Sequence, residues 1–496
     1  MKVSFLSELK SFNKQSTIVV LKLEDEKQNI SGVNVINLQG QVEKACQTEQ
    51  FKGKAGSVLK LVHPEGCLFS RLLVVGLGKN PENNEAWKKA GRATLFALKN
   101  VKETVVLTDF ENHSSSFQAV MDYVLEMMLK SYTFDRYHTK SKKDVSEIYD
   151  DLSVVVVTKE ASFCQKEFHK VEAVVQGSNV ARDLVNEPAN VLGTDEFVSR
   201  IKKLNKMGIE VDVLDKKQIA QLGMNSLLAV AQGSDCPPYL AIMKWQGSSS
   251  QEAPLSFVGK GVVFDSGGIS IKPSGGMEDM KGDMAGAAIV VGLMHTLAAR
   301  KAKVNVVAVV GLVENMPSGK AQRPGDIVTS MSGQTIEVIN TDAEGRMVLA
   351  DALYYTKNHV KPQLIVDLAT LTGAIMVALG EEHAGLFSNN NDLAQKLLSS
   401  GQITGEKLWL MPLSEEYDRL IDSKFADMRN SSGRLAGSIT AAQFLKRFVG
   451  EDIPWAHIDV AGVAFNDKVS VVNNSWSTGF GVRLLNQLVA NYYEKK

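Results

Sequence analysis

The sequence has little of several features that mark large protein classes. Among its 496 residues are only four cysteines, and their scattered positions match neither a disulfide framework nor a metal-ligand spacing. Free thiols in a reducing cytosol are therefore expected. No apolar run of about 18 residues predicts a membrane span, and the first residues lack the apolar core of a signal peptide. These absences predict a cytoplasmic protein.

An excess of charge of one sign is also missing. The chain has 55 Lys and Arg against 56 Asp and Glu, a formal net charge of −1, so no overall field attracts nucleic acid or an anionic membrane. The segment GLGKNP at 76–81 has a proline where a dinucleotide-binding loop needs its third glycine, and no P-loop is present. The histidines are dispersed. His457, in an apolar strand-like run, is interpreted as a core histidine rather than a metal ligand.

The hydrophobic pattern predicts an α/β protein in two parts. Residues 1–160 alternate strand-like and helix-like runs, which predicts a small amino-terminal α/β domain. Residues 161–185 predict a connecting helix. Residues 186–496 predict a larger α/β domain with a mixed central sheet flanked by helices. In the first part, the expected strands are 17–21, 72–76, 104–107 and 152–157, and the expected helices are 85–99 and 117–131.

The most informative segment is the octapeptide NTDAEGRM at 340–347. A strand-like run at 335–339 precedes it and a helix-like run at 347–353 follows it, which places it on a strand-to-helix turn where open α/β sheets bind ligands. If the chain is extended there, Asp342 and Glu344 project to the same side. Their repulsion would be relieved by a divalent cation. The alternative is a pair of acidic residues that simply favours the start of a helix.

A buried strand is predicted at 256–265, and it contains a lysine. Lys260 is unusual there because an unpaired buried ammonium group is costly. It becomes tolerable if its pKa is lowered and the neutral amine binds a partner. Lys260 and Asp265 would face opposite ways on a flat strand. Either Gly259 and Gly261 bend the strand, or the chain turns before Asp265.

Two charged residues follow this strand. Asp283 precedes a helix-like run at 284–300, and an N-cap is one interpretation of it. Lys272 lies between glycine pairs that predict tight loops. A solvated loop lysine is its simplest interpretation.

Together these segments resemble the leucyl aminopeptidases, the cytosolic two-metal exopeptidases. The resemblance covers roughly residues 180–490 continuously, whereas the first 160 residues match only in length and general character. Met347 stands where leucine is usual in the octapeptide, a mild departure. The other matching motifs are DLVNEPAN at 183–190, ENMPSG at 314–319, RPGD at 323–326, DLATLTGA at 367–374 and WAHIDVAG at 455–462.

The resemblance implies a role for each matching position. One metal would be held by Asp265, Asp342 and Glu344, with the backbone carbonyl of Asp342 included. The other would be held by Lys260, Asp265, Asp283 and Glu344, so that Asp265 and Glu344 bridge the two ions. A ligand set of carboxylates with one amine suits Mn²⁺, Zn²⁺ or Mg²⁺ without strict selectivity.

Two further matching positions are not ligands. By resemblance, Lys272 polarises the scissile carbonyl, and Arg346 holds a bicarbonate that acts as general base. These roles are compatible with peptide hydrolysis, which needs an activated water, an electrophilic carbonyl and stabilisation of developing negative charge. Two divalent ions roughly 3.5 Å apart can supply the first two.

The resemblance also implies a substrate pocket and an assembly. The pocket would accept a medium apolar side chain such as Leu, although Met280 and the alanines could simply be core. Its positions are Met280, Thr370, Leu371, Gly373, Ala461 and Ala464. The implied protein is the catalytic chain of a cytoplasmic homohexamer that releases amino-terminal residues, preferably Leu, from peptides.

Two other functions compete with this one. Some relatives of the family bind DNA, so an architectural or regulatory DNA-binding protein with an incidental peptidase site is the main alternative. Clustering of Lys and Arg on one face would support it, whereas the near-neutral charge disfavours it. A metal-dependent phosphoesterase would need a phosphate clamp beyond Lys272 and Arg346, and the sequence offers none.

Overall fold

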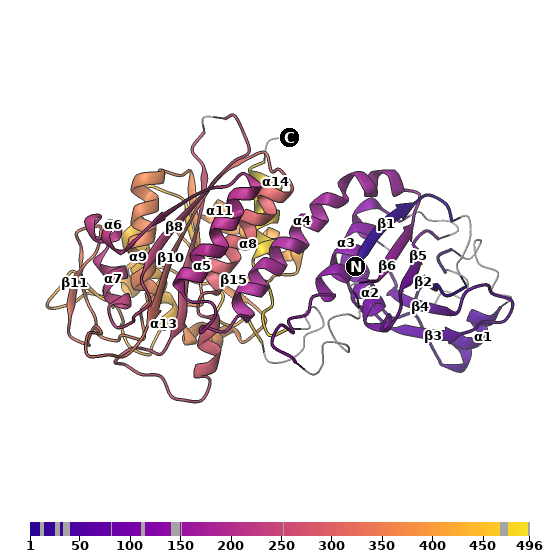
Figure 1. Ribbon diagram of the computed structural model, residues 1–496, viewed down its shortest axis with the longest axis horizontal. Helices are drawn as coiled ribbons and strands as arrows, with labels where there is room; N and C mark the ends of the chain where they lie inside the picture. Colours follow the sequence, from indigo (N-terminus) through magenta and orange to yellow (C-terminus); the bar gives the residue numbers. More distant parts are fainter. Residues whose placement is uncertain are drawn as a thin grey trace. The chain divides into compact units, whose positions relative to one another are not determined.

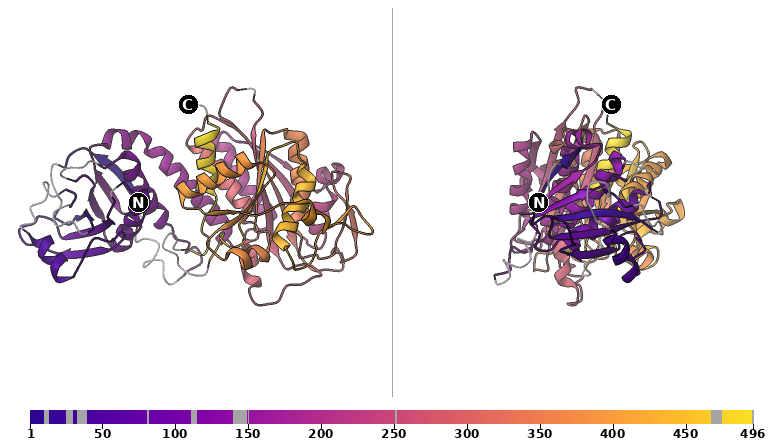
Figure 2. Two further views of the ribbon diagram at one scale, coloured as in Figure 1. Left: turned by 180° about the vertical axis from the view of Figure 1, so that it is seen from behind. Right: turned by 90° about the vertical axis from the view of Figure 1, so that its right-hand side faces the viewer.

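The chain forms two compact units in the computed structural model, each with its own β-sheet (Figures 1 and 2). The first unit is mainly Met1–Val175, and the second is mainly Gln176–Lys468 with Trp476–Lys496. The 26-residue helix α4 (Ala161–Asn186) leads from one to the other. The structure describes residues 1–9, 14–24, 30–32, 40–80, 82–110, 115–139, 149, 151–250, 252–466 and 475–494.

The first unit is built on a six-stranded sheet in the order β1-β6-β5-β2-β4-β3. All neighbouring strands are parallel except β3 and β4, which are antiparallel. Apolar clusters cover both faces, one of them beneath α2 and α3. Its elements are β1 (Lys2–Leu6), β2 (Thr17–Leu23), α1 (Gln41–Thr48), β3 (Val58–Val62), β4 (Arg71–Gly78), α2 (Asn84–Ala97), β5 (Glu103–Leu107), α3 (Phe117–Lys130) and β6 (Ser153–Val157).

The second unit is built on an eight-stranded mixed sheet in the order β15-β14-β17-β13-β9-β10-β8-β7. The four central strands are parallel, and β14, β8 and β7 bring antiparallel pairings. These strands are β7 (Glu210–Leu214), β8 (Tyr239–Gln246), β9 (Leu255–Asp265), β10 (Asn305–Asn315), β13 (Leu364–Ala369), β14 (Ala384–Ser388), β15 (Leu408–Leu410) and β17 (Trp455–Asp459).

Helices cover both faces of this sheet, as Figures 1 and 2 show. One apolar cluster lies under α5, α8, α11 and α14, and a second lies under α7, α9 and α13. The α/β class and the mixed, helix-flanked sheet predicted from the sequence are therefore confirmed. The helices are α5 (Thr194–Lys202), η1 (Lys203–Met207), α6 (Lys216–Gln221), α7 (Asn225–Ala231), η2 (Met277–Gly282), α8 (Ala285–Ala299), α9 (Gly345–Tyr355), η3 (Thr356–Val360), α10 (Gly373–Leu379), α11 (Asn391–Thr404), α12 (Glu415–Arg419), α13 (Gly437–Val449) and α14 (Val482–Tyr492).

Helix α8 packs unusually close to strand β9. A Cβ at Gly259 would lie 2.6 Å from the Cα of Ala287, so only glycine allows this approach. The segment Met277–Ala299 is also long and apolar enough to cross a membrane by length and composition, contrary to the sequence expectation. Because 89% of its most apolar window is buried inside the protein, it has the character of a core helix.

A β-bulge resolves the question that Lys260 and Asp265 raised. Val262 of β9 lies opposite Val313 of β10, but Asp265 lies opposite Asn315, so three steps along β9 face two along β10. The extra residue reverses the side-chain alternation beyond Val262 and turns Lys260 and Asp265 toward the same site. The pairing with β10 is regular at Gly259 and Gly261, and β9 continues to Asp265. Neither of the two alternatives drawn from the sequence is therefore correct.

The strand before the octapeptide is not part of the central sheet. Of the predicted run 335–339, only β12 (Thr335–Glu337) forms a strand, in a three-stranded sheet with β11 (Ile327–Thr329) and β16 (Met428–Arg429). The sequence predicted a strand of the open sheet before the octapeptide and a helix after it. The helix is present, but the strand belongs to a different sheet, so that part of the prediction is wrong. The octapeptide reaches the ends of β9 and β10 from outside the sheet.

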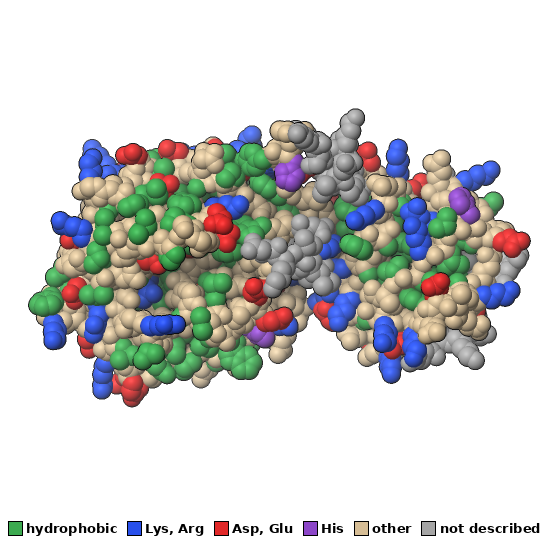
Figure 3. Space-filling view, turned by 90° about the horizontal axis from the view of Figure 1, so that it is seen from below, with side chains coloured by type: hydrophobic (Ala, Val, Ile, Leu, Met, Phe, Trp, Pro, Cys, Tyr) green, Lys and Arg blue, Asp and Glu red, His purple; other side chains and the backbone are tan. Residues whose placement is uncertain are grey.

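Side chains of both charge signs are present on the face drawn in Figure 3, and no continuous basic stripe is seen on that face. That face therefore offers no concentrated positive field for nucleic acid.

Asp351 fastens helix α9 to its surroundings and makes stability depend on pH. Its fully buried carboxylate accepts hydrogen bonds from the backbone N–H groups of Leu227 (2.9 Å) and Met331 (2.8 Å). Burial raises the pKa of Asp351 to about 7, against about 3.9 in an unfolded chain. Between those values the folded state binds more protons than the unfolded state, so this group makes the free energy of unfolding fall as pH rises.

We therefore expect Asp351→Asn, which cannot ionise, to gain stability relative to wild type between about pH 5 and about pH 8, by on the order of 2 kcal/mol. Thermal melting of both proteins across that range measures the difference. A stability difference between the two proteins that does not change with pH would show that Asp351 is already ionised in the folded protein at about pH 5.

Candidate metal centre

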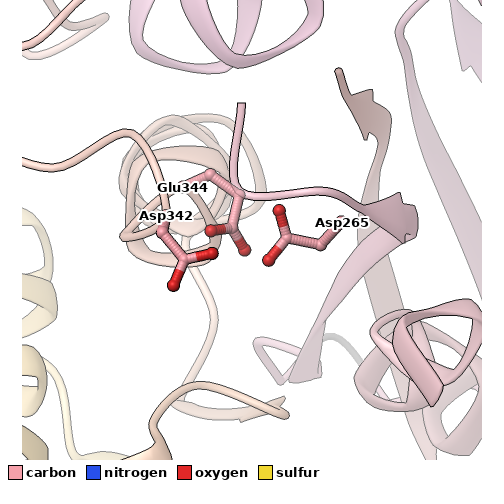
Figure 4. A group of neighbouring side chains, drawn as sticks. All are labelled: Asp265, Asp342 and Glu344. Atoms are coloured by element: carbon pink, nitrogen blue, oxygen red, sulfur yellow. The ribbon is translucent and has the colours of Figure 1, made fainter. Parts of the chain in front are cut away.

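Three carboxylates meet beyond the end of strand β9 (Figure 4). Asp265, Asp342 and Glu344 each offer an oxygen, and these oxygens all lie within 4.8 Å of one another. Asp265 is the last residue of β9, and the other two lie in the turn before α9. Glu344 already has helical backbone angles, so the turn is not extended as the sequence argument assumed. The two acids nevertheless converge on the same site.

Lys260 lies beneath this cluster and is almost fully buried. Its Nζ is 2.7 Å from Oδ1 of Asp283 and 2.8 Å from Oε1 of Glu344. Burial lowers its pKa, but the surrounding carboxylates outweigh burial and raise the pKa above its ordinary value. The carboxylates thus compensate the charge of the ammonium group, and a lowered pKa in the presence of a bound cation stays a prediction.

The glycine of the octapeptide makes room for this lysine. A Cβ at Gly345 would lie 2.6 Å from Cε of Lys260 and 2.7 Å from its Nζ. Any other residue would push the lysine away from Glu344 or displace the start of α9. The presence of glycine between Glu344 and Arg346 thus has a steric cause.

Asp283 does not cap helix α8. The N-cap is Met284, and Asp283 is the C-cap that follows the 3-10 helix η2. Its Oδ1 instead accepts hydrogen bonds from Nζ of Lys260 (2.7 Å) and from the hydroxyl of Thr370 (2.8 Å). The N-cap interpretation is therefore wrong, and Asp283 belongs to the same cluster.

Two carboxylate oxygens in this cluster have neither a hydrogen bond nor an ion pair within the described part of the chain, whereas a third oxygen without a hydrogen bond, Oδ1 of Asp342, is paired with Lys272. The two are Oδ2 of Asp283 and Oε2 of Glu344, and both are buried. A buried carboxylate oxygen without a donor is costly, and a divalent cation would satisfy it. The donor set of four carboxylates and one amine fits hard divalent ions. The residues present therefore fit the metals that the resemblance implies.

Lys272 is not a solvated loop lysine. Its Nζ lies 2.8 Å from Oδ2 of Asp265 and 2.5 Å from Oδ1 of Asp342. Burial and the neighbouring charge of Glu344 raise the pKa of Asp265 to about 6, although Lys272 and Lys260 oppose the shift. Such a perturbed carboxylate beside two lysines is typical of a functional site.

Arg346 lies in the first turn of α9 and is 7% exposed. Its guanidinium makes no hydrogen bond or ion pair with any described residue, and burial lowers its pKa to about 10. A buried cation with no anion in direct contact is costly, and the charges of Glu344 and Asp459 offset that cost only from a distance. The position of Arg346 therefore favours an anionic ligand from outside the chain.

One residue that orients the centre, Asn315, was not among the site residues expected from the sequence. Asn315, at the end of β10, donates from Nδ2 to Oδ1 of Asp265 (2.7 Å) and to the backbone carbonyl of Thr341 (3.1 Å). It thereby ties the end of β9 to the octapeptide. A polar residue at the end of a buried strand was the available signal. His457 is a core histidine as expected, with Nδ1 2.6 Å from Oδ1 of Asp367.

The predicted pocket positions fall into three segments: η2 with Met280, residues 370–373 after β13, and residues 461–464 after β17. Thr370 contacts the cluster directly, because its backbone carbonyl accepts from Lys260 at 2.9 Å. Gly373 is exposed, and a Cβ there would meet nothing within 4 Å. Ala461 and Ala464 are buried in the two apolar clusters, in agreement with the core interpretation, whereas Met280 is half-buried in η2.

The fold and the site together define the class of protein: a two-unit α/β metallohydrolase with a carboxylate-lined centre. Comparison with known families agrees with this definition. A model described as cytosol aminopeptidase family, catalytic domain, matches residues 179–486, and one described as the N-terminal domain of the same family matches residues 18–141. The chain belongs to the cytosol aminopeptidase family, and it is a metal-dependent aminopeptidase.

Individual relatives support the same assignment over nearly the whole chain. A "Probable cytosol aminopeptidase" of Phytoplasma mali (strain AT) is 57% identical over 499 residues and covers 100% of both chains. One of Agrobacterium fabrum (strain C58 / ATCC 33970) is 54% identical over 478 residues and covers 96% of both. The resemblance noted in the sequence is thus confirmed, and these matches give no support to the DNA-binding alternative.

Solved structures share the fold. A mutant of tomato leucine aminopeptidase superimposes with a TM-score of 0.86 at 32% identity, covering 99% of this chain and 96% of that one. The bottromycin maturation enzyme BotP, solved in complex with Mn, gives a TM-score of 0.83 at 30% identity, with 96% and 99% covered.

Proposed function

We propose that the chain is a leucyl aminopeptidase that removes amino-terminal residues from peptides with two divalent ions. The observation that carries this proposal is the buried carboxylate cluster, in which Oδ2 of Asp283 and Oε2 of Glu344 have neither a hydrogen bond nor an ion pair among the described residues. Mn²⁺ or Zn²⁺ suits this donor set, and Mg²⁺ is a third candidate. BotP, a relative in structure, was solved with Mn.

The proposed ligands divide between two positions. Asp265, Asp342 and Glu344 would hold one ion, and Lys260, Asp265, Asp283 and Glu344 would hold the other. Two such ions, when bound, would lower the pKa of water and polarise the scissile carbonyl. The contacts of Lys260 support this division, because its Nζ pairs with Asp283 and Glu344 and forms no ion pair with Asp342 among the described residues.

Two residues would act on the substrate without holding a metal. Lys272 is partly exposed at the mouth of the cluster, where its ammonium group would stabilise the oxyanion that develops on the carbonyl. Arg346 would hold a bicarbonate, which would accept a proton from the attacking water. The buried guanidinium without an acceptor supports this role.

The substrate would be recognised by its free amine and its first side chain. Leu371 and Gly373 would position the substrate main chain. A small pocket that includes Met280, Thr370 and Ala461 would accept Leu or a similar apolar residue, although the burial of Ala464 in the core argues that it shapes the pocket from behind.

The domain limits, assembly and location complete the proposal. Residues 1–160 would form the amino-terminal domain, 161–185 the connecting helix and 186–496 the catalytic domain. The division of the structure near residue 175 and the two family matches support these limits. The family resemblance supports a homohexamer, and the relatives' name, cytosol aminopeptidase, supports a cytoplasmic location.

The proposal is tested by hydrolysis of leucyl p-nitroanilide by the purified full chain. Mn²⁺ is compared with a chelator, and an N-acetylated leucyl substrate is the matched control. We expect metal-dependent cleavage of the free-amine substrate alone, because the free amine is needed at the metal centre. Absence of cleavage with any metal, in folded and metal-loaded protein, would overturn the proposed function.

A further inference from the structure

One buried carboxylate outside the metal cluster accepts hydrogen bonds from two of the segments that carry predicted pocket positions, the one that follows β13 and the one that follows β17. Asp459 is the last residue of β17 and is 1% exposed. Its Oδ1 accepts from the backbone N–H groups of Leu371 (3.0 Å) and Ala461 (3.2 Å). Its Oδ2 accepts from the hydroxyl of Thr372 at 2.7 Å. Three donors from two loops thus converge on one side chain.

The first of these loops follows strand β13 and leads into helix α10. Thr372 is the N-cap of α10, and its hydroxyl accepts from the backbone N–H of Ile375 at 3.1 Å while it donates to Asp459. Asp459 therefore fixes both the start of α10 and the N–H of Leu371. The carbonyl of the preceding residue, Thr370, accepts from Lys260. The loop is held at one end by the metal cluster and at its centre by Asp459.

The second loop follows β17. The N–H of Ala461 is bound to Asp459, and the next residues turn back so that the N–H of Ala464 donates to the carbonyl of Val460 at 2.9 Å. The two loops are far apart in the sequence, and they lie side by side because the strands that precede them, β13 and β17, are paired. Where the two strands end, the N–H of Val460 donates to the carbonyl of Ala369 at 2.8 Å, and beyond that point the carboxylate of Asp459 joins the two loops.

A carboxylate in this place is not needed for packing. The described part of the chain shows no ion pair to Asp459, so its burial costs free energy that only hydrogen bonds and more distant charges offset. Burial raises the pKa of Asp459, and the neighbouring His457 opposes the shift. A charged acceptor binds N–H donors about twice as strongly as a neutral one, which favours a role that requires rigid loops.

We propose that Asp459 is a positioning residue for the substrate: it holds the Leu371 loop and the Ala461 loop at the spacing that the amino-terminal residue of the peptide requires. The inference rests on the proposed function, because it assigns substrate contacts to these loops. Among the described residues, Asp459 forms no hydrogen bond or ion pair with the metal cluster, so its proposed role acts through the two loops.

The test compares Asp459→Asn and Thr372→Val with Thr372→Ser, which keeps the hydroxyl. In the Mn²⁺-loaded full chain, we expect the first two to raise KM for leucyl p-nitroanilide about tenfold or more, with a smaller effect on kcat and unchanged metal content. Thr372→Ser should stay within about twofold of wild type. Asp367→Asn is the matched control, because Asp367 is an equally buried acid on the neighbouring strand that binds Trp455 and His457.

That control should lower the melting temperature without raising KM. Hydrogen exchange gives a readout that does not depend on activity: amides at 371–379 should exchange faster in Asp459→Asn and Thr372→Val, and not in Asp367→Asn. Unchanged KM in active variants, or unchanged exchange, would overturn the inference. Wild-type protein that cleaves nothing would instead overturn the proposed function, and with it the substrate role, while faster exchange would still identify the anchor.

Discussion

Glu344→Gln is expected to lose metal and to reduce turnover by roughly a thousandfold, which corresponds to about 4 kcal/mol of transition-state stabilisation. Glu344 is fully buried, and Oε1 contacts Nζ of Lys260 while Oε2 has no partner in the described part of the chain. Glutamine keeps the volume but removes the charge. The neighbouring ammonium groups of Lys260 and Lys272 then lose a counter-charge. The cluster becomes more positive, which weakens its binding of two metal cations.

Metal content after dialysis and kcat at saturating Mn²⁺ measure this expectation. Asp326→Asn is the matched control, because Asp326 is an acid on a nearby loop that pairs with exposed Arg323 at 3.0 Å and takes no part in the cluster. The control should keep its metal and its turnover. Full metal content and near-normal kcat in Glu344→Gln would remove Glu344 from the proposed ligand set.

Local pattern was enough to predict the elements that hold the site but not how they meet. The β-branched runs at β2, β4, β5 and β6 matched strands to within one or two residues, because alternating or continuous burial leaves a clear periodicity. The short edge strands β1 and β3 gave no such signal. Only one residue of β3, Leu59, is buried.

The sequence could find the acidic residues but not their geometry. Strand periodicity placed Lys260 and Asp265 on opposite faces, and only the bulge opposite Val313 brings them together. A bulge depends on the pairing with β10, about 50 residues away, and local sequence does not encode it. The same limit explains Asp283, whose partners are Lys260 in β9 and Thr370 just after β13.

Residues that orient the site were hardest to predict. Asn315 and Asp459 each end a buried strand, and either could have been an ordinary strand-ending polar residue. Their importance rests on donors and acceptors from distant segments: Thr341 for Asn315, and Leu371 for Asp459. Buried polar groups must find partners, but the sequence does not say which.

Lys272→Ala and Arg346→Ala are expected to lower turnover by roughly a hundredfold or more while metal content stays close to wild type. Lys272 pairs with Asp265 and Asp342, so its loss leaves those carboxylates more negative and at least as able to bind cations. Arg346 contacts none of the carboxylates in the described part of the chain, so its loss should leave the ligands in place. Exposed Lys320, replaced by Ala, is the matched control and should have no effect.

The two variants should differ in their response to bicarbonate. In buffer depleted of carbon dioxide, added bicarbonate should raise the wild-type and Lys272→Ala rates but not that of Arg346→Ala, because only the last lacks the buried guanidinium that would hold the anion. Arg346→Lys, which keeps the charge but not the paired N–H donors, should recover only part of the response. Loss of metal from both alanine variants would contradict their assignment to catalysis and make both residues structural. An equal bicarbonate response in all variants would remove the anion from Arg346.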